Sequence, residues 1–456
     1  MKRQLVKPLL LLTLMVASAC SAAKFKAPQV DLPQSYLYER VTTAGDTTVN
    51  LEWWENFGDS TLTALVEEAL TENFDVRVAA ISLMTAKLQL RQARAGLAPA
   101  FGLAIDADAT YTPSTKIVQE YSIQPTLSWE IDLFGKLRYE AVAKRAEMFS
   151  SAENVRAVKL SVASEVADAY FDILEYDLSR RIAESTLKIR DEYAELVGVM
   201  VEYGEGTELE VQQNRELVAT AKAALEKYTL STQQAIMALC VLLGRNPTEM
   251  EVDGRKLLEY CVPKSVPGGL PSTLLERRAD IKEAYWAVES AYAKVGVQIA
   301  SRFPTISLTA EGGIVGATLS ALFTDTEFNW TAGLSLVEPL FSFGRLRRNV
   351  EIAEQEKEQS LLTYSQKVIT ALSEVEKALL GIEYVALEIE AERELVEANK
   401  IYAGLTEELY RGGVGDYLTV LDAQRQYFAS QLSYASLLSS QLSGYVTLYK
   451  ALGGGW

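Results

Sequence analysis

The chain has 456 residues, with 61 acidic against 44 basic side chains, and a formal net charge of −17. Nucleic acid is therefore excluded as an expected partner, because its phosphates repel such a chain. There is no histidine, which excludes a His-based catalytic triad and a HExxH metal site. We expect neither an enzyme nor a protein that holds a cofactor or a metal.

The N-terminus has the pattern of a secretory signal peptide. Three basic residues precede an apolar run at residues 9–16, and small residues then lead to Cys20. Because residues 1–19 end before a cysteine, they resemble a bacterial lipoprotein signal, in which that cysteine is lipidated and becomes the first mature residue. The resemblance implies lipidation of Cys20 and, because Ser21 rather than Asp follows it, an outer-membrane address.

Four stretches alternate apolar and polar side chains. They are residues 101–111, 121–133, 305–311 and 328–336. Such alternation predicts strands with one apolar and one polar face. Strands of about nine to eleven residues with one apolar face cross outer membranes as parts of closed barrels. We therefore expect two membrane hairpins, at about 101–134 and 305–343, against the alternative of two amphipathic hairpins packed on a soluble core.

The second half of the chain repeats the first. The hairpins end in FGKLR and FGRLR, whose first residues, Phe134 and Phe343, are 209 positions apart. Asp75 and Asp280, which precede the hairpins, are 205 positions apart, so four additional residues are expected in the second hairpin, where an exposed loop tolerates them. The repeat predicts one pseudo-symmetric body instead of the two or three ordinary domains that the length would suit.

Long helices are predicted after both hairpins. Residues 136–202 and 345–411 contain no proline and few glycines, and each would be roughly 100 Å long at about 1.5 Å per residue. Apolar residues of the first helix, among them Val162, Val166 and Ile173, recur at steps of three and four, which predicts one packing seam.

Glycine-rich turns are predicted to reverse these long helices. YGEGTELEV begins at Tyr203 and RGGVGDYLTV at Arg411. Glycine permits the positive φ angles of tight turns, and the glycines concerned are Gly204, Gly206, Gly412, Gly413 and Gly415. Thr207 with Glu210 predicts a capping box, which would begin a return helix over about 208–243. Another helix, over about 60–97, is expected before the first hairpin.

Five segments resemble a known family. They are WWENFGDSTLTALVEEAL (Trp53–Leu70), LLGRNP (Leu242–Pro247), LPSTLLERRADI (Leu270–Ile281), PLFSFGRLR (Pro339–Arg347) and KALGGGW (Lys450–Trp456). These look like the signature segments of the outer-membrane factors, the TolC and OprM group, and within that group of the lipidated efflux proteins of NodT type. The resemblance covers essentially the whole mature chain.

The resemblance implies a mainly α fold with a membrane β-barrel portion. Three protomers, each giving four strands, would form a 12-stranded β-barrel that is continued by a long periplasmic α-helical barrel. The physics of membranes agrees, because four strands are too few to close a barrel and leave unpaired edges in lipid. The expected division is a lipoprotein signal peptide at 1–19, an N-terminal extended segment at 20–59, a first repeat at 60–243, an equatorial connection at 244–272 and a second repeat at 273–456. Each repeat would hold a helix, a β-hairpin, a long helix and a return helix.

The function implied is that of the outer-membrane channel of a tripartite efflux system. The homotrimer would sit in outer-membrane lipid as a passive exit duct for small molecules, which reach it from a periplasmic adaptor and an inner-membrane pump. One alternative is an exit duct for type I protein secretion. An alternative of a different class is a periplasmic coiled-coil adaptor without a channel, although such an adaptor does not need two pairs of alternating strands.

The resemblance also implies where the channel narrows. Asp422, in VLDAQ, matches the position at which three carboxylates form a ring that attracts cations. Tyr410 and Glu210 match the residues that link neighbouring helices in a closed state, and Asp416 is a further candidate at this periplasmic aperture. The adaptor is expected to contact the helix-tip turns, at Gly204, Gly206, Gly413, Val414 and Gly415.

Simpler roles remain open for several of these residues. Asp416 is equally an N-cap candidate, Asp422 an ordinary solvated residue, and Glu210 part of the capping box without any gate. Arg411 and Arg425 either pair across the tips or offset local acidic residues.

The two remaining cysteines leave one more alternative open. A disulfide between Cys240 and Cys261 would be permitted in an oxidising periplasm. A buried unpaired Cys240 is the expectation, because it lies in the apolar stretch IMALCVLLG.

Overall fold

The computed structural model describes residues 25, 27–28, 32–33, 35–37, 52–114, 116–251, 253–260, 271–324 and 327–454. The predicted signal peptide, Cys20 and Cys261 lie outside these residues. Within them, no helix combines the length and the hydrophobicity that a membrane span requires. Contacts group the chain into two compact units, each of which draws on both halves of the sequence. The first unit comprises Ile81–Asn154 and Asp280–Lys367 with the described part of Met1–Val30, and the second comprises Asp31–Ala80, Val155–Ala279 and Val368–Trp456.

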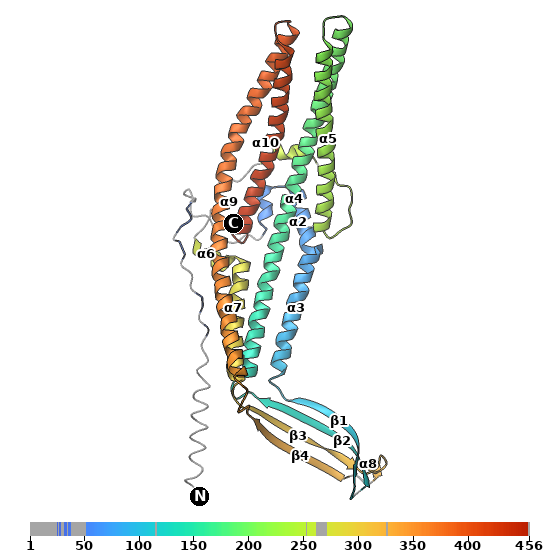
Figure 1. Cartoon of the computed structure of the whole chain (residues 1–456), viewed down its shortest axis with the longest axis vertical. Coiled ribbons are helices and arrows are strands. Elements are labelled where there is room, and N and C mark those ends of the chain that lie inside the picture. Colours follow the sequence, from blue (N-terminus) through green and yellow to red (C-terminus); the bar gives the residue numbers. More distant parts are fainter. Residues whose placement is uncertain are drawn as a thin grey trace. The chain divides into compact units, whose positions relative to one another are not determined.

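The first unit contains a four-stranded antiparallel sheet in the order β1-β2-β3-β4 (Figure 1). The strands are β1 (Ala100–Thr112), β2 (Lys116–Ile131), β3 (Thr305–Gly316) and β4 (Glu327–Val337). Ile105 lies opposite Ile123, which lies opposite Ile314, which in turn lies opposite Phe328. Because residues directly opposite each other share a face, the predicted apolar side chains of all four strands are on one face.

This apolar face is exposed, and the opposite face is polar. Leu103 and Trp330, in the two outer strands, are 62% and 73% exposed. The polar face carries Asp106 opposite Ser122, and Glu311 opposite Thr126. The alternation predicted from the sequence is therefore confirmed in all four strands.

The ends of the two hairpins differ in detail from the expectation. β2 ends at Ile131. The carboxylate of Asp132, the next residue, accepts hydrogen bonds from the backbone N–H groups of Leu137 and Arg138, at 3.2 and 2.9 Å, and so satisfies donors in the first turn of the following helix. The connection between β3 and β4 contains a short helix, α8 (Ala321–Thr324). This agrees with an insertion in the second hairpin.

Helices make up most of the remaining described residues. They are α2 (Ser60–Glu72), α3 (Phe74–Ala95), α4 (Lys136–Glu202), α5 (Glu208–Leu242), α6 (Pro271–Arg277), α7 (Ala279–Ala300), α9 (Arg345–Arg411) and α10 (Tyr417–Ala451), with the 3-10 helices η1 (Trp53–Phe57) and η2 (Gly254–Leu258). The two predicted long helices are confirmed as α4 and α9, with 67 residues each. Each turns back into a helix of 35 residues, α5 or α10.

The helix expected over about 60–97 is in fact two helices, which meet at Asn73. Its side-chain oxygen accepts hydrogen bonds from the N–H groups of Asp75 and Val76, at 2.8 and 3.2 Å, and so caps α3. Its amide nitrogen donates to the carbonyl of Leu242 at the end of α5, at 2.8 Å. Gly244, with φ 68°, lies so close that an added Cβ would be 2.5 Å from the carbonyl oxygen of Glu72. The break is therefore the place where the end of α5 packs.

An equivalent break separates α6 from α7 at Arg278, which is 205 positions after Asn73. One guanidinium nitrogen of Arg278 donates to Glu374 at 2.7 Å and to the carbonyl of Ala451, at the end of α10, at 3.0 Å. Gly453, with φ 83°, packs against the backbone of Arg278. Because Gly453 follows Gly244 by 209 positions, the sequence repeat is also a repeat in packing.

The main hydrophobic core lies in the second unit, among η1, α2, α4, α5 and α10. Trp53 is fully buried, and its ring stacks on Tyr449 with 5.3 Å between centroids. The predicted seam of α4 is confirmed, since Val162, Val166 and Ile173 are all buried in this core. Full burial of such a side chain contributes about 1.5–3 kcal/mol relative to exposure.

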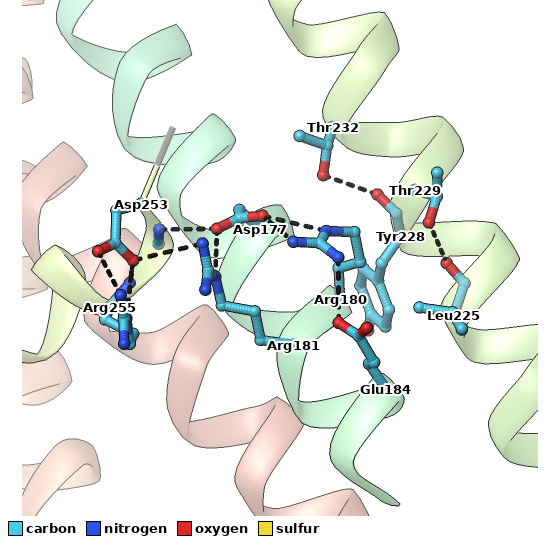
Figure 2. A network of polar contacts seen from close by, with 11 residues as sticks. Asp177, Arg180, Arg181, Glu184, Leu225, Tyr228, Thr229, Thr232, Asp253 and Arg255 are labelled. Carbon is cyan, nitrogen blue, oxygen red and sulfur yellow. Dashed lines mark hydrogen bonds and ion pairs between the residues drawn. The ribbon is translucent and has the colours of Figure 1, made fainter. Parts of the chain in front are cut away.

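A polar network fixes η2 to the middle of α4 (Figure 2). The Asp177 carboxylate accepts from Arg181 Nε at 2.7 Å, from Arg180 Nη2 at 2.8 Å and from the backbone N–H of Gly254 at 2.8 Å. Arg181 also reaches Asp253, at 3.5 Å. Burial raises the pKa of Asp177, but the donors from Arg181, Gly254 and Arg180 outweigh burial and hold this pKa below its usual value.

A substitution at Gly254 tests the contact between η2 and α4. A Cβ there would be 2.3 Å from the backbone nitrogen of Leu178 and 2.6 Å from the carbonyl oxygen of Leu174, and helix backbone cannot move aside. We expect Gly254→Ala to lower stability by about 1–3 kcal/mol through overpacking. Thermal unfolding, followed by far-ultraviolet circular dichroism, measures the change.

Gly198 in α4 provides the matched control, because a Cβ there meets no atom within 4 Å. Gly198→Ala should raise stability by up to about 1 kcal/mol. Equal melting temperatures for the Gly254→Ala protein and the wild type would show that η2 is not held tightly on α4.

Candidate functional site at the helix-hairpin tips

The turn between α4 and α5 is a Schellman motif. Gly204 has φ 76°, and its N–H donates to the carbonyl of Val201 at 3.0 Å. The N–H of Glu205 donates to the carbonyl of Met200 at 2.8 Å. This pair of hydrogen bonds satisfies the last carbonyls of α4, and the positive φ favours glycine.

The turn between α9 and α10 has the same geometry, 209 positions later (Figure 1). Gly413 has φ 75°, and its N–H donates to the carbonyl of Tyr410 at 2.9 Å. The N–H of Val414 donates to the carbonyl of Leu409 at 3.0 Å. The expectation of positive φ is therefore confirmed for Gly204 and Gly413.

Gly206 and Gly415 are needed for a different reason from the one expected. Neither has a positive φ. A Cβ on Gly206 would lie 2.9 Å from the side chain of Val201, and one on Gly415 would lie 2.9 Å from the backbone nitrogen of Tyr410. These glycines allow the chain to pass close to the last turn of the helix it has just left.

The two return helices begin differently. The Thr207 hydroxyl accepts from the N–H of Glu210 at 3.3 Å, and the Glu210 carboxylate accepts from the N–H of Thr207 at 2.7 Å. The predicted capping box is therefore confirmed. Asp416 has the extended backbone of an N-cap residue, but its side chain makes no capping hydrogen bond. The carboxylate of Asp416 is exposed and is not used by its own helix.

A small apolar cluster connects the two hairpins behind the tips. This tip cluster consists of Val197 from α4, Leu217 from α5 and Tyr417, Val420 and Leu421 from α10, with Val211 and Tyr410 packed against it. The rings of Tyr410 and Tyr417 are 5.0 Å apart. Burial, and then the nearby Glu210 carboxylate, raise the pKa of Tyr410. The structure thus brings the two linking candidates, Tyr410 and Glu210, together, while the carboxylate of Glu210 also serves the capping box.

The two arginines of the second tip behave differently from each other. Arg425 of α10 forms an ion pair with Glu216 of α5, which joins the hairpins. Arg411 pairs with Glu407 of its own helix at 2.7 Å, and its guanidinium lies 5.8 Å from the ring centroid of Tyr193 in α4. Of the two open alternatives, pairing across the tips is confirmed for Arg425. Glu216 was missed in the sequence, although it precedes Arg425 by the repeat offset of 209 and has the opposite charge.

Asp422 lies on the exposed side of α10. Its carboxylate accepts a hydrogen bond from the Gln426 side chain, one helical turn later, at 2.7 Å. Asp422 is not part of the tip cluster. Its expected place in a ring of three carboxylates involves other copies of the chain and stays a prediction.

Large apolar side chains are exposed at both tips. Val414 is 82% exposed and Tyr203 is 80% exposed. Leu209 and Leu418 are exposed beside them. Only Val414 was singled out in the sequence, although the other three lie in or next to the same glycine-rich turns. Such residues, gathered at one place, are typical of a surface that contacts another protein.

Several proteins are similar to this chain along nearly its whole length. The profile of a family described as "Outer membrane efflux protein" matches residues 65–245 and 270–454. The antibiotic efflux pump outer membrane protein ArpC of Pseudomonas putida is 32% identical over an alignment of 465 positions, which covers 98% of this chain and 95% of ArpC. The probable outer membrane lipoprotein SilC of Salmonella typhimurium is 30% identical, with 99% of each chain covered.

A solved structure has the same fold. The open state of the MtrE outer membrane channel of Neisseria gonorrhoeae matches with a TM-score of 0.87 and 27% identity, over 95% of this chain and 98% of that one. This match confirms the predicted fold class, which combines long helices with strands as the outer-membrane channels do. It also agrees with the predicted location in the outer membrane. The chain belongs to the outer membrane efflux protein family.

Proposed function

We propose that this chain forms the exit duct of a tripartite efflux system, a passive outer-membrane channel for small molecules. The observation that carries the proposal is the sheet of β1 to β4, with an exposed apolar face and an opposite polar face. Such a sheet suits a wall between lipid and a water-filled pore. Relatives such as ArpC are components of efflux pumps by name, which supports the same role here.

The edges of the sheet support a homotrimer. In the described residues, β1 pairs only with β2, and β4 pairs only with β3. An unsatisfied backbone group in lipid costs several kcal/mol, so both edges need further strands. Three copies would supply twelve strands, the number that the resemblance to the outer-membrane factors implies.

Exposed apolar strips on the helices of the second unit support the same assembly. On the part of α9 in this unit, the exposed large apolar side chains fall within an arc of about 120° at 3.6 residues per turn. They are Ile369, Tyr384, Leu387, Leu395, Ile401, Tyr402, Leu405 and Leu409. A second strip on α5 comprises Leu209, Leu230, Met237 and Val241. Exposed apolar side chains aligned on one side of a helix are typical of an interaction surface, and neighbouring copies would cover them.

The tips would form the periplasmic aperture and contact the adaptor. Asp422 and Asp416 are exposed carboxylates, and three copies would bring them around one axis, where like charges attract cations. Tyr410 and Glu210 lie at the tip cluster, which connects the two hairpins. Val414, with Gly204, Gly206, Gly413 and Gly415, would present the turns to a periplasmic adaptor.

The family is one of channel proteins, and we infer that this chain has no catalytic activity. The absence of histidine removes the commonest general base. The energy and the choice of substrate would come from an inner-membrane pump, to which the adaptor connects the duct. Lipidation of Cys20 would add one anchor to the membrane, beside the sheet.

Conductance tests the duct directly. Purified full-length protein in detergent should migrate as a trimer after chemical crosslinking, because the strand edges are satisfied only between copies. The same material should open discrete ion-conducting steps in planar bilayers. Protein that stays monomeric and leaves the bilayer insulating would contradict the proposal.

Asp422 tests the aperture. Asp422→Ala should raise single-channel conductance or weaken block by divalent cations, because three negative charges are removed from a narrow ring. Glu394→Ala, which removes an exposed acidic residue from α9, is the matched control and should leave the block unchanged. If both variants match the wild type, Asp422 does not belong to the gate.

Cys20 tests the lipid anchor. Cells grown with radioactive palmitate should incorporate label into the wild-type protein, because the cysteine after residues 1–19 would carry the acyl chains. The Cys20→Ser protein should remain unlabelled. Equal labelling of the two proteins would disprove lipidation at this residue.

A further inference from the structure

The chain that follows Cys20 contacts α7 through one aromatic ring. Phe25, five residues after Cys20, is half-buried. Its ring centroid lies 5.5 Å from that of Tyr285 and 5.4 Å from that of Tyr292, with interplanar angles of 83° and 86°. Edge-to-face contacts at such distances are favourable beyond the burial of apolar area. Phe25 and both tyrosines belong to the first unit.

Tyr285 and Tyr292 are spaced to hold one ring between them. They are seven residues apart in α7, which is two helical turns, so both lie on one side of the helix and about 10 Å apart along its axis. Phe25 is almost equally far from each tyrosine, so its ring fills the space between them. These two tyrosines form the Phe25 socket.

Two residues of α9 contact the rings of the Phe25 socket. Tyr285 makes an edge contact with Tyr364, at 6.5 Å between ring centroids. The Lys357 ammonium lies 5.3 Å from the ring centroid of Tyr292, within the range of a cation–π interaction. Contacts other than those with Phe25 therefore restrict both tyrosine rings.

The Phe25 socket occurs in only one of the two repeats. With the offset of 205 positions that applies before the hairpins, Tyr285 corresponds to Ala80 and Tyr292 to Lys87, both in α3. Neither of these has a ring that could contact a phenylalanine. The internal repeat therefore does not explain the two tyrosines, and one socket in each chain matches the single N-terminus of each chain.

Docking of Phe25 limits the distance over which Cys20 can move. Five residues span at most roughly 18 Å, so Cys20 stays within that distance of Phe25. The next buried residue in the described part of this segment is Tyr36, which would leave a tether of sixteen residues with a reach of roughly 58 Å. The end of α7 is about 12 Å beyond Tyr292 along the helix, and β3 begins at Thr305.

We propose that Tyr285 and Tyr292 dock Phe25 and thereby confine the acylated N-terminus to the end of α7, where the sheet begins. The acyl chains of Cys20 then enter the membrane beside the strands that cross it. A short tether raises the effective concentration of the acyl chains at that membrane surface. This inference rests on the proposed lipidation of Cys20, whereas the docking of Phe25 needs no lipid.

Photocrosslinking tests the docking without reference to lipid. The photoreactive amino acid p-benzoylphenylalanine replaces Phe25 in the full-length protein, and trypsin then releases the peptide of residues 283–294, which contains both tyrosines. Light should attach residue 25 to this peptide. The same amino acid in place of Leu37, which is 84% exposed, should not crosslink to it. Crosslinks from residue 25 that avoid residues 283–294 would overturn the proposal.

Trypsin tests whether the ring of Phe25 holds the segment. Lys24 and Lys26 flank Phe25, and cleavage after either releases the acylated N-terminus as a short lipopeptide. Release from purified protein labelled with radioactive palmitate should be about tenfold faster for Phe25→Ala, because two aromatic contacts are lost. Phe25→Tyr, which keeps a ring, and Leu37→Ala, which shortens an exposed side chain of the same segment, should match the wild type. Equal release from Phe25→Ala and the wild type would overturn the proposal.

A photoreactive fatty acid tests the position of the acyl chains. Cells supplied with a palmitate analogue that carries a diazirine should attach it at Cys20. Illumination of the purified protein should then join the N-terminal peptide to the tryptic peptide of residues 303–345, which contains β3 and β4. Phe25→Ala should lower the yield severalfold.

The two crosslinks separate failed docking from failed lipidation. A wild-type protein that carries the analogue but forms no crosslink to residues 303–345 would overturn the confinement of the acyl chains. A wild-type protein without any label would refute lipidation of Cys20 and the anchoring with it. In that case the crosslink from residue 25 to residues 283–294 would show that Phe25 still docks.

Discussion

Unsatisfied backbone hydrogen bonds at the two edges of the sheet are the constraint on which this structure depends. β1 and β4 each pair with one neighbour in the described chain, and the apolar face of the sheet is exposed. In lipid such edges are too costly to leave open. A single copy is therefore incomplete, and the exposed apolar strips on α5 and α9 have the same explanation. Transport therefore requires that several copies of the chain first assemble.

The internal repeat preserves backbone geometry and changes side chains. Gly204 and Gly413 occupy equal places in the two tip turns, and Gly244 and Gly453 occupy equal places at the ends of the return helices. At the breaks, however, Asn73 caps a helix, whereas Arg278 binds Glu374 and the end of α10. One tip has a capping box, and the other leaves Asp416 exposed. The two hairpins thus share one fold but differ in chemistry, and the aperture would be built from two kinds of tip.

Local patterns made most of the fold predictable, and distant contacts decided the rest. The alternation of apolar and polar residues identified the strands. Both ends of α4 and α9 were predicted correctly, because each helix follows an FGKLR or FGRLR segment and ends at a glycine-rich turn. The capping box was predictable because Thr207 and Glu210 are three residues apart. The break at Asn73 was missed, because its amide binds Leu242, far away in the sequence. The burial of Arg190 in α4, where it is only 2% exposed and donates to the carbonyl of Leu217, was missed because one arginine in a long helix resembles any solvated residue. The gate candidates depend on neighbouring copies, which no local pattern describes.

Hydrogen–deuterium exchange of the backbone amides in the four strands tests the central claim most directly. If copies pair through their edges, the amides of β1 and β4 in the purified assembly should exchange as slowly as those of β2 and β3. Rapid exchange of the outward-facing amides of β1 and β4, alongside protected β2 and β3, would contradict closure between copies. It would leave the sheet as an open surface feature of a single chain.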